Sequence, residues 1–213
     1  MTDFSSLGLN PQLCRACDAL GYTMPSPIQE KAIPLMLQGH DVLGIAQTGT
    51  GKTAAYALPV LMRCKYAQGK NPRALILAPT RELVMQIHEV MVGLAAETDL
   101  RMLALYGGLG PKTQIQALED GVDILVSTPG RFLELYRKDT IVVKDLKILI
   151  LDEADKMMDM GFMPQIREIL EKIPYKKRQN GLFSATFPEK VENLSHEFLE
   201  FPHKVEITRQ ATP

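Results

Sequence analysis

Short apolar runs alternate with helical patterns along most of the chain. The strand-like runs cover residues 41–45, 74–78, 102–106, 123–127, 147–151, 181–184 and 205–207. Continuous apolar strands that alternate with helices predict a parallel sheet covered by helices on both faces. No internal repeat or low-complexity segment interrupts the pattern. We therefore expect an α/β fold in a single domain.

Helix boundaries follow from capping residues, glycine and proline. Ser26 followed by Pro27 is typical of a helix start, because serine caps the first turn and proline fits into it. Gly39 marks the end of this helix. Another helix is predicted to open at residues 79–83 and to run toward Glu97.

A glycine-rich stretch, AQTGTGKT at residues 46–53, lies between the predicted strand 41–45 and a helical pattern. Strand, glycine-rich turn and helix start are the context that a phosphate-binding loop requires. Gly49 and Gly51 would let backbone amides face an anion, and the helix dipole adds about half a positive charge there. The stretch departs from the usual pattern at Ala46, where a first glycine is common. A chance glycine-rich turn is the alternative, but the context favours a nucleotide site.

Four side chains have the chemistry of a triphosphate site. Lys52 would reach the outer phosphates, and the Thr53 hydroxyl would contact Mg²⁺. Asp152 and Glu153 follow four apolar residues, which is the pattern of an acidic pair at the end of a buried strand. Asp152 would hold Mg²⁺, partly through water, and Glu153 would orient and polarise the attacking water. Acidic residues also favour helix N-termini, but the phosphate loop upstream favours metal binding and catalysis.

Residues 184–186, Ser-Ala-Thr, end another predicted strand. Ser184 and Thr186 would couple the acidic site to domain movement through hydrogen bonds. Ligands of parallel sheets bind outside the carboxyl ends of the strands, so we expect these motifs to gather on one rim. Four methionines follow the acidic pair, and we favour packing of their side chains into a helical core: Met157, Met158, Met160 and Met163.

Composition and charge limit the possible partners. Among the 213 residues, 46% are hydrophobic and 23% charged, which is typical of a globular protein. The formal net charge is −1, so nucleic acid binding cannot be argued from global charge and would need a few placed groups. The dense basic run at residues 176–178 is interpreted as a solvated turn.

Cysteine usage and hydropathy predict a cytoplasmic protein without a membrane segment. No run of about 18 apolar residues occurs, and the N-terminus has no basic segment before an apolar one. Three cysteines argue for a reducing compartment. Cys14 and Cys17 form a CxxC pair, for which zinc or redox chemistry is an alternative. Because no second pair accompanies it and residues 11–20 have a helical pattern, we favour a structural helix.

Taken together, the motifs resemble those of the first RecA-like domain of a DEAD-box RNA helicase, of a bacterial RhlE-like type. The resemblance covers nearly the whole chain. It rests on Phe4 upstream of GYTMPSPIQ at 21–29, AQTGTGKT at 46–53, PTREL at 79–83, Gly107 and Gly108, TPGR at 128–131, DEAD at 152–155 and SAT at 184–186.

The resemblance implies ATP and Mg²⁺ as cofactors. Gln29 would recognise the adenine edge, with Phe4 and Tyr22 against or near the ring. Lys52, Thr53, Asp152 and Glu153 would be the catalytic residues. The loop residues that would bind the nucleotide are Ala46, Gln47, Thr48, Gly49, Thr50, Gly51, Lys52 and Thr53.

The resemblance also implies contacts with the RNA sugar-phosphate backbone. Thr80 and Thr128 stand at helix starts, where free backbone N–H groups donate hydrogen bonds to phosphates. Such contacts carry no base information, so binding should be largely sequence-independent. The residues implied are Pro79, Thr80, Arg81, Gly108, Thr128, Gly130 and Arg131.

Domain boundaries follow from the same resemblance. Residues 1–30 are expected to form the adenine-recognition (Q motif) segment, 31–207 the RecA-like ATP-binding domain, and 208–213 the start of an inter-domain linker. The family's second RecA-like domain, with its arginine-bearing HRxGRxGR motif, is not among these residues. We therefore expect a fragment of a longer protein that is monomeric and nearly inactive by itself.

Two functions remain open from the sequence. One is the ATP-binding lobe of an RNA helicase, and the other is an ATP-gated RNA clamp or assembly factor in which unwinding is incidental. A DNA translocase is less favoured, because the DEAD and Gln29 motifs point to RNA-dependent ATPases.

Overall fold

Seven parallel strands form one sheet in the computed structural model, which describes residues 3–108 and 110–208. The order across the sheet is β3-β4-β2-β5-β6-β1-β7. The prediction of a parallel α/β sheet is confirmed. The strands are β1 (Val42–Ile45), β2 (Ala74–Leu77), β3 (Met102–Leu105), β4 (Ile124–Ser127), β5 (Ile148–Leu151), β6 (Gln179–Ser184) and β7 (His203–Glu206).

Helices connect successive strands. Asn10 caps α1 with its side chain, which accepts a hydrogen bond from the backbone N–H of Leu13, and Ser26 stands before Pro27 at the start of α2, as predicted. The helices are the short 3₁₀ turn η1 (Ser5–Leu7), α1 (Pro11–Ala19), α2 (Pro27–Leu37), α3 (Lys52–Cys64), α4 (Arg81–Leu94), α5 (Lys112–Asp120), α6 (Pro129–Arg137), α7 (Ala154–Asp159), α8 (Met163–Lys172) and α9 (Glu189–Phe198).

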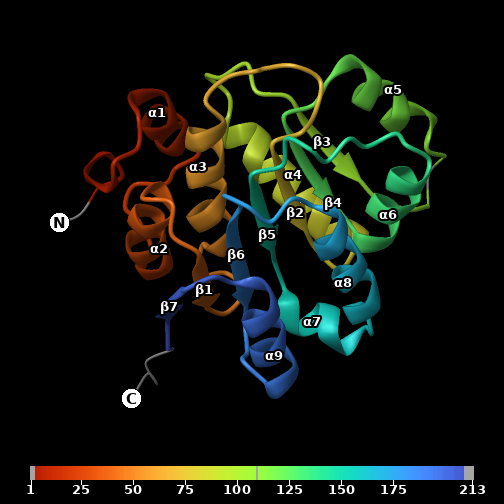
Figure 1. The fold of residues 1–213 in the computed structure, drawn as a ribbon. Helices are drawn as coiled ribbons and strands as arrows, with labels where there is room; N and C mark the ends of the chain where they lie inside the picture. The colour runs from red at the N-terminus through yellow and green to blue at the C-terminus, as the bar shows by residue number, and fades with distance from the viewer. Residues whose placement is uncertain (1–2, 109, 209–213) are drawn as a thin grey trace.

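Each face of the sheet has its own hydrophobic core. Along β2, Ala74 and Ile76 pack into one core, whereas Leu75 and Leu77 pack into the other. This alternation follows from the two-residue period of a strand. Helices α1 to α4 cover the first face, and α6 to α9 cover the second (Figure 1). Every strand between the edges is thus covered on both sides, which explains the continuous apolar runs.

The methionine, cysteine and lysine side chains singled out in the sequence differ in their burial. Met157 and Met158 are buried in the core as expected, but Met160 is half exposed. Cys14 and Cys17 lie on α1, and burial first, with the nearby Cys14, raises the pKa of the Cys17 thiol to about 12. Lys176 and Lys177 form an exposed turn.

No helix in the described part of the chain is long and apolar enough to cross a membrane. Of the expected linker start at 208–213, residues 209–213 lie outside the described residues, so that boundary stays a prediction.

Parallel strands present all their carboxyl ends at one rim of the sheet. The loop 46–51 follows β1, and the acidic pair follows β5 directly. Since β6 pairs with both β1 and β5, only one strand separates these two motifs. The fold therefore brings together residues that lie about a hundred positions apart in the sequence.

Candidate nucleotide-binding and catalytic site

The loop after β1 turns on glycines with left-handed backbone angles. Gly49 and Gly51 each have φ of +87°, a conformation that favours glycine. A side chain at Gly51 would also collide with the Gln29 amide, which lies directly against it. Gly51 is the N-cap of α3, so the first free amides of that helix open toward the loop.

Gln29 joins the first turn of α2 to this loop. Its Oε1 accepts a hydrogen bond from the backbone N–H of Ser26 at 3.0 Å, and its Nε2 donates to the Gly51 carbonyl at 3.1 Å. The side chain is 6% exposed. An amide offers two donor hydrogens and two acceptor lone pairs, so one of each remains for a ligand.

Lys52 faces the acidic pair across the site. Its Nζ lies 3.3 Å from Glu153 Oε1 and 4.0 Å from Asp152 Oδ1, and all three side chains are about 5% exposed. From the other side, Lys156 Nζ lies 3.6 Å from Glu153 Oε2. One buried ammonium thus stands between two buried carboxylates, in the position predicted for the outer phosphates and their metal.

Tyr56 holds the Asp152 carboxylate, and the sequence analysis did not identify it. The Tyr56 hydroxyl, on the second turn of α3, donates to Asp152 Oδ2 at 2.6 Å, and the Glu153 backbone N–H donates to Asp152 Oδ1 at 2.7 Å. Burial raises the pKa of the Asp152 carboxyl, while Lys52 and the Tyr56 hydroxyl act in the opposite direction. Burial, and then the Asp152 charge, raise the Tyr56 pKa well above its usual value, so the phenol keeps its proton and donates.

Glu153 has an unusual backbone conformation. Its φ of +54° and ψ of +46° place it in the left-handed region, where non-glycine residues are uncommon. This conformation costs on the order of 1–3 kcal/mol and is found mainly at functional sites. Its Oε2 is buried and makes no hydrogen bond in the described structure.

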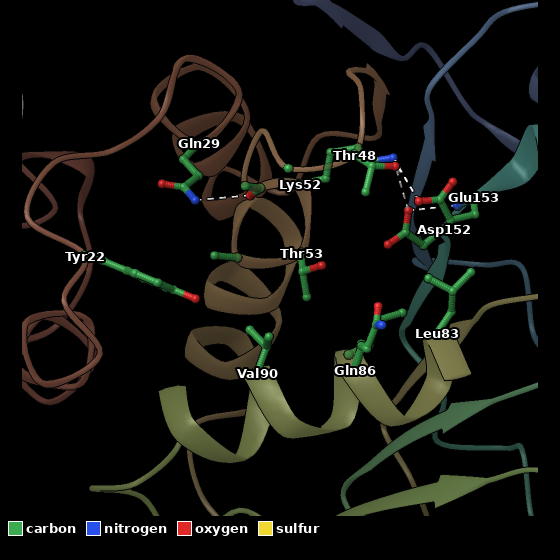
Figure 2. A pocket seen from close by; sticks show the side chains of 14 residues that line it. Tyr22, Gln29, Thr48, Lys52, Thr53, Leu83, Gln86, Val90, Asp152 and Glu153 are labelled. Atoms are coloured by element: carbon green, nitrogen blue, oxygen red, sulfur yellow. Dashed lines mark hydrogen bonds and ion pairs between the residues drawn. The ribbon is translucent and has the colours of Figure 1, made fainter. Parts of the chain in front are cut away.

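A cavity of about 300 Å³ connects these groups (Figure 2). In Figure 2, Tyr22 and Gln29 stand at one end, the acidic pair at the other, and Lys52 and Thr53 between them. Helix α4 forms a wall that the sequence analysis did not assign, with Leu83, Gln86, Ile87 and Val90. The predicted site residues that line the cavity are Tyr22, Gln29, Thr48, Gly49, Gly51, Lys52, Thr53, Asp152 and Glu153.

Four residues predicted to bind nucleotide are not part of the cavity wall. Phe4 and Ala46 are buried in the core, at 4% and 1% exposure. Gln47 and Thr50 lie on the loop and contact each other, since the Thr50 hydroxyl donates to the Gln47 carbonyl. A role for these four residues in nucleotide binding stays a prediction.

The residues after β6 contact the acidic motif through its last aspartate. Ser184 Oγ accepts a hydrogen bond from the Asp155 backbone N–H at 3.1 Å. Thr186 donates to Asp155 Oδ2 through its backbone N–H at 3.2 Å and its hydroxyl at 2.9 Å. Three hydrogen bonds thus connect residues 184–186 to the motif that contains Asp152 and Glu153.

Comparison with known proteins agrees with this geometry. The DEAD/DEAH box helicase family model matches residues 26–194. The chain belongs to this family. It is 44% identical over 210 residues to the ATP-dependent RNA helicase DeaD of Buchnera aphidicola subsp. Schizaphis graminum, covering 98% of this chain and 35% of that protein. It is 42% identical over 207 residues to the ATP-dependent RNA helicase CshA of Listeria monocytogenes, covering 97% of this chain and 39% of that protein.

A solved structure has the same fold. The crystal structure of a DEAD box protein from the hyperthermophile Methanococcus jannaschii superposes with a TM-score of 0.91 at 34% identity, over 97% of this chain and 56% of that one. The chain spans about a third of the length of the curated relatives it matches. The relatives named here are DeaD and CshA proteins, so the RhlE-like subtype stays a prediction.

In this DEAD box chain, part of the predicted RNA face is assembled on the same rim. The Arg81 guanidinium lies over the Tyr106 ring at 5.0 Å, and its Nη1 would be 3.3 Å from a side chain at Gly108. Thr80 caps α4, since its hydroxyl accepts a hydrogen bond from the Leu83 backbone N–H at 3.2 Å. Arg81 and Gly108 are exposed, whereas Pro79 is buried behind them.

The second DEAD box segment predicted to contact RNA, residues 128–131, differs in accessibility. Thr128 is the N-cap of α6, and Gly130 is exposed in the first turn. Arg131 is only 7% exposed, and its Nε lies 3.5 Å from Glu134 Oε2. The backbone at the start of α6 can be reached from solvent, while contact between RNA and the Arg131 guanidinium stays a prediction.

Replacement of Tyr56 by phenylalanine tests the hydrogen bond from its hydroxyl to the Asp152 carboxylate. We expect Tyr56→Phe to lower the free energy of unfolding of the nucleotide-free chain by about 1–3 kcal/mol, because a buried carboxylate loses a donor. Tyr136→Phe is the matched control, since the Tyr136 ring stacks on Phe132 and its hydroxyl makes no hydrogen bond in the described structure. Urea denaturation measures both variants. Equal stability of the two would contradict the role assigned to Tyr56.

Proposed function

We propose that this chain is the ATP-binding lobe of an ATP-dependent RNA helicase, in which RNA-dependent ATP hydrolysis drives local duplex unwinding by the longer protein. The observation that carries the proposal is the single cavity that joins Gln29 to Lys52, Asp152 and Glu153. Family membership and relatives named ATP-dependent RNA helicases support it.

The donor set fits a magnesium–nucleotide complex. Thr53 and Asp152 would hold Mg²⁺, Asp152 partly through water, and the ion would neutralise charge on the phosphates. Two buried carboxylates face the buried Lys52 ammonium, and Glu153 Oε2 accepts no hydrogen bond although Lys156 Nζ lies 3.6 Å away, so carboxylate oxygen is available to a cation. No group of three or more histidine, cysteine or acidic side chains in the described residues could hold a metal alone. A Mg²⁺ site completed by substrate phosphates needs only one or two carboxylates.

Each remaining catalytic residue has a separate task. Lys52 would exchange its contact with Glu153 for the negatively charged outer phosphates, because its ammonium already lies where that charge is expected. This exchange would release Glu153 Oε1 to accept a proton from the attacking water. The left-handed backbone at Glu153 is a strained conformation of the kind that is concentrated at functional sites.

RNA is the second ligand that we propose. The exposed backbone at Gly108 and at the start of α6, with Arg81 beside it, would contact sugar and phosphate without reading bases. The bonds between residues 184–186 and Asp155 would report movement of a second RecA-like domain to the acidic motif. A cytoplasmic location is proposed on the reducing chemistry expected of three free thiols.

Comparison of RNA with DNA tests the proposal in the longer protein. We expect RNA to stimulate ATP turnover and DNA of the same sequence to leave it near the basal rate. Equal stimulation by both would favour a DNA translocase and contradict the proposal. A protein that retains RNA in the presence of ATP but separates no strands would be the clamp instead.

Replacement of Gln29 tests adenine recognition. We expect Gln29→Ala to weaken ADP binding and to narrow the preference for ADP over GDP, because a base edge read by a paired amide is discriminated strongly. The change also removes a hydrogen bond to Ser26 and one to Gly51, which lowers affinity for any nucleotide. The ratio of the two affinities is therefore the diagnostic quantity, and calorimetric titration measures it. An unchanged ratio would contradict the assignment.

A further inference from the structure

Three hollows lie at the rim opposite the nucleotide site, where the strands begin. Lys147 directly precedes the four-residue strand β5 and Asp152 directly follows it, so five residue-to-residue steps of extended chain, about 16 Å, separate the two rims. The hollows have volumes of about 710, 270 and 330 Å³, and Arg63, near the end of α3, lines all three. The three hollows adjoin at Arg63 and share no lining residue with the nucleotide cavity.

This surface is strongly basic, although the chain has a net charge of −1. Six cationic residues and two carboxylates line the hollows. Of the carboxylates, Asp41 is 6% exposed and already accepts hydrogen bonds from Asn180 and from the Glu200 backbone. Glu200 is therefore the one exposed acid among the described residues that line the hollows.

Two of the six cations are already engaged by the fold. Arg73 forms an ion pair with Asp123 at 2.9 Å, and the Asp123 carboxylate also accepts hydrogen bonds from Arg101. Arg178 donates to Asn180 Oδ1 at 2.7 Å. The other four are exposed and their side chains make no ion pair or hydrogen bond within the described ranges 3–108 and 110–208: Arg63, Lys65, Lys147 and Lys177. We call these four residues the basic rim.

Exposed aromatic rings stand among these free cations. Tyr66 lines the hollow beside Lys65 and Lys147, and Phe201 lines the hollow beside Lys177. Their exposures of 58% and 89% are high for aromatic side chains. Tyr175, at 72%, precedes Lys177 in the same turn. The fold therefore leaves three flat apolar surfaces in solvent, separated by positive charge.

The backbone holds several of these residues in an uncommon conformation. Lys65, Lys177 and Phe201 have φ of 63°, 60° and 46°, in the left-handed region that side-chain-bearing residues rarely adopt. Among the described residues, the other non-glycine positions of this kind are Asp139 and the catalytic Glu153. Backbone strain of this kind costs free energy at each residue and is concentrated at functional sites.

We propose that the basic rim, with Tyr66, Tyr175 and Phe201, binds single-stranded RNA without sequence preference and independently of ATP. Placed cations that track phosphates, with aromatic rings on which bases stack, are the chemistry of single-strand binding. An acidic peptide would use the cations but would leave the isolated rings without a partner. The hollows are open and divided by charge, so they do not offer the continuous apolar groove that a helical peptide needs.

The proposal predicts how strongly the affinity for RNA should depend on salt concentration. Four phosphate contacts on a single strand predict a slope of about −2.8 for the logarithm of affinity against the logarithm of salt concentration. Between about 50 and 200 mM salt, the affinity should then fall roughly 50-fold. Because the site lies on the rim away from the nucleotide, ADP should not change this binding.

Charge reversal tests the site in the nucleotide-free chain, with a fluorescently labelled oligouridylate as the probe. We expect Lys65→Glu/Lys147→Glu/Lys177→Glu to lower affinity at least 100-fold and to flatten the salt slope. The matched control, Lys31→Glu/Lys112→Glu/Lys190→Glu, makes the same change in net charge at exposed lysines elsewhere and should retain most of the affinity. Retention of ADP binding by both variants shows that they fold.

Removal of the rings separates RNA from a protein partner. Tyr66→Ser/Phe201→Ser should weaken oligouridylate binding about tenfold or more, while polyglutamate should bind weakly to every variant. An equal loss in the control variant, tighter binding of polyglutamate than of RNA, or full affinity after removal of both rings would each overturn the proposal. The nucleotide site is not altered by these changes, so failure here leaves the proposed ATPase function standing.

Discussion

Residues 1–213 alone are expected to bind adenine nucleotide and to hydrolyse ATP at a rate near background, whether or not RNA is added. Phosphoryl transfer depends on stabilising charge on the γ-phosphate, and an arginine supplied for this purpose is worth about 10³–10⁵ in rate. The described residues that line the cavity include no arginine. We expect a second RecA-like lobe of the longer protein to supply that arginine.

RNA should make little difference to the single lobe for a related reason. We expect RNA to lie across both lobes, so the proposed contacts near Arg81 would be only part of its binding surface and this lobe should hold RNA there weakly. Joining the second lobe in cis should restore RNA-stimulated turnover, by about 10³-fold or more. A phosphate-release assay on both proteins measures this. Brisk RNA-dependent hydrolysis by residues 1–213 would overturn the two-lobe mechanism.

Glu153→Gln is expected to abolish hydrolysis in the two-lobed protein and to leave nucleotide affinity nearly unchanged. The amide keeps the size of the side chain and its place in the cavity, but it cannot accept the proton of the attacking water. Loss of a general base typically costs about 10²–10⁴ in rate. Glu153 contacts Lys52 at 3.3 Å, and we propose that phosphate replaces this contact, so the nucleotide-bound state should not depend on the Glu153 charge.

Lys52→Ala provides the comparison for this variant. Removing a charge-assisted phosphate contact should cost about 1.5–3 kcal/mol of binding free energy, which is roughly a 10- to 150-fold loss of nucleotide affinity. Both affinities can be measured by titration with a fluorescent ADP analogue. A loss of affinity in Glu153→Gln as large as that in Lys52→Ala would show that our assignment of the two roles is wrong.

The sheet could be predicted from the sequence because its strands are buried on both faces. Runs such as residues 74–77 are continuously apolar, and no helix of useful length fits between the flanking turn residues. The strand ends then fixed the position of each polar motif, since parallel strands share one carboxyl rim. The cluster of Lys52, Asp152 and Glu153 follows from that topology, whereas Gln29 reaches it from the first turn of α2.

The contacts that side chains on helices make with other elements could not be predicted in this way. Tyr56 lies in an apolar stretch of α3 and has the pattern of a core residue. Its hydroxyl nevertheless donates a hydrogen bond to Asp152 from the second turn of that helix. Gln86 and Val90 enter the cavity because α4 crosses beneath it, which depends on helix packing. The burial of Arg131 could not be predicted either, because it depends on how α6 packs; its Nε lies 3.5 Å from Glu134 Oε2, and its contact with RNA stays a prediction.

The basic rim could not be predicted from the sequence for a different reason. Residues 176–178 were interpreted as a solvated turn, which is correct for Lys176 and Lys177 taken alone. Arg63 and Lys147 come from distant parts of the chain, and they meet Lys177 only after the strands pair. Local charge patterns cannot show a patch that the fold assembles from separate loops.

Strand separation by the two-lobed protein tests the central claim most directly. A short RNA duplex with one labelled strand is incubated with the wild-type protein or Glu153→Gln, with and without ATP, and the released strand is followed with time. We predict that the wild type releases the labelled strand through repeated turnovers when ATP is present. Glu153→Gln should not release the strand through repeated turnovers. Equal release by both proteins, or retention of the duplex by the wild type in the presence of ATP, would contradict the assignment of this cavity as the hydrolytic site of an RNA helicase.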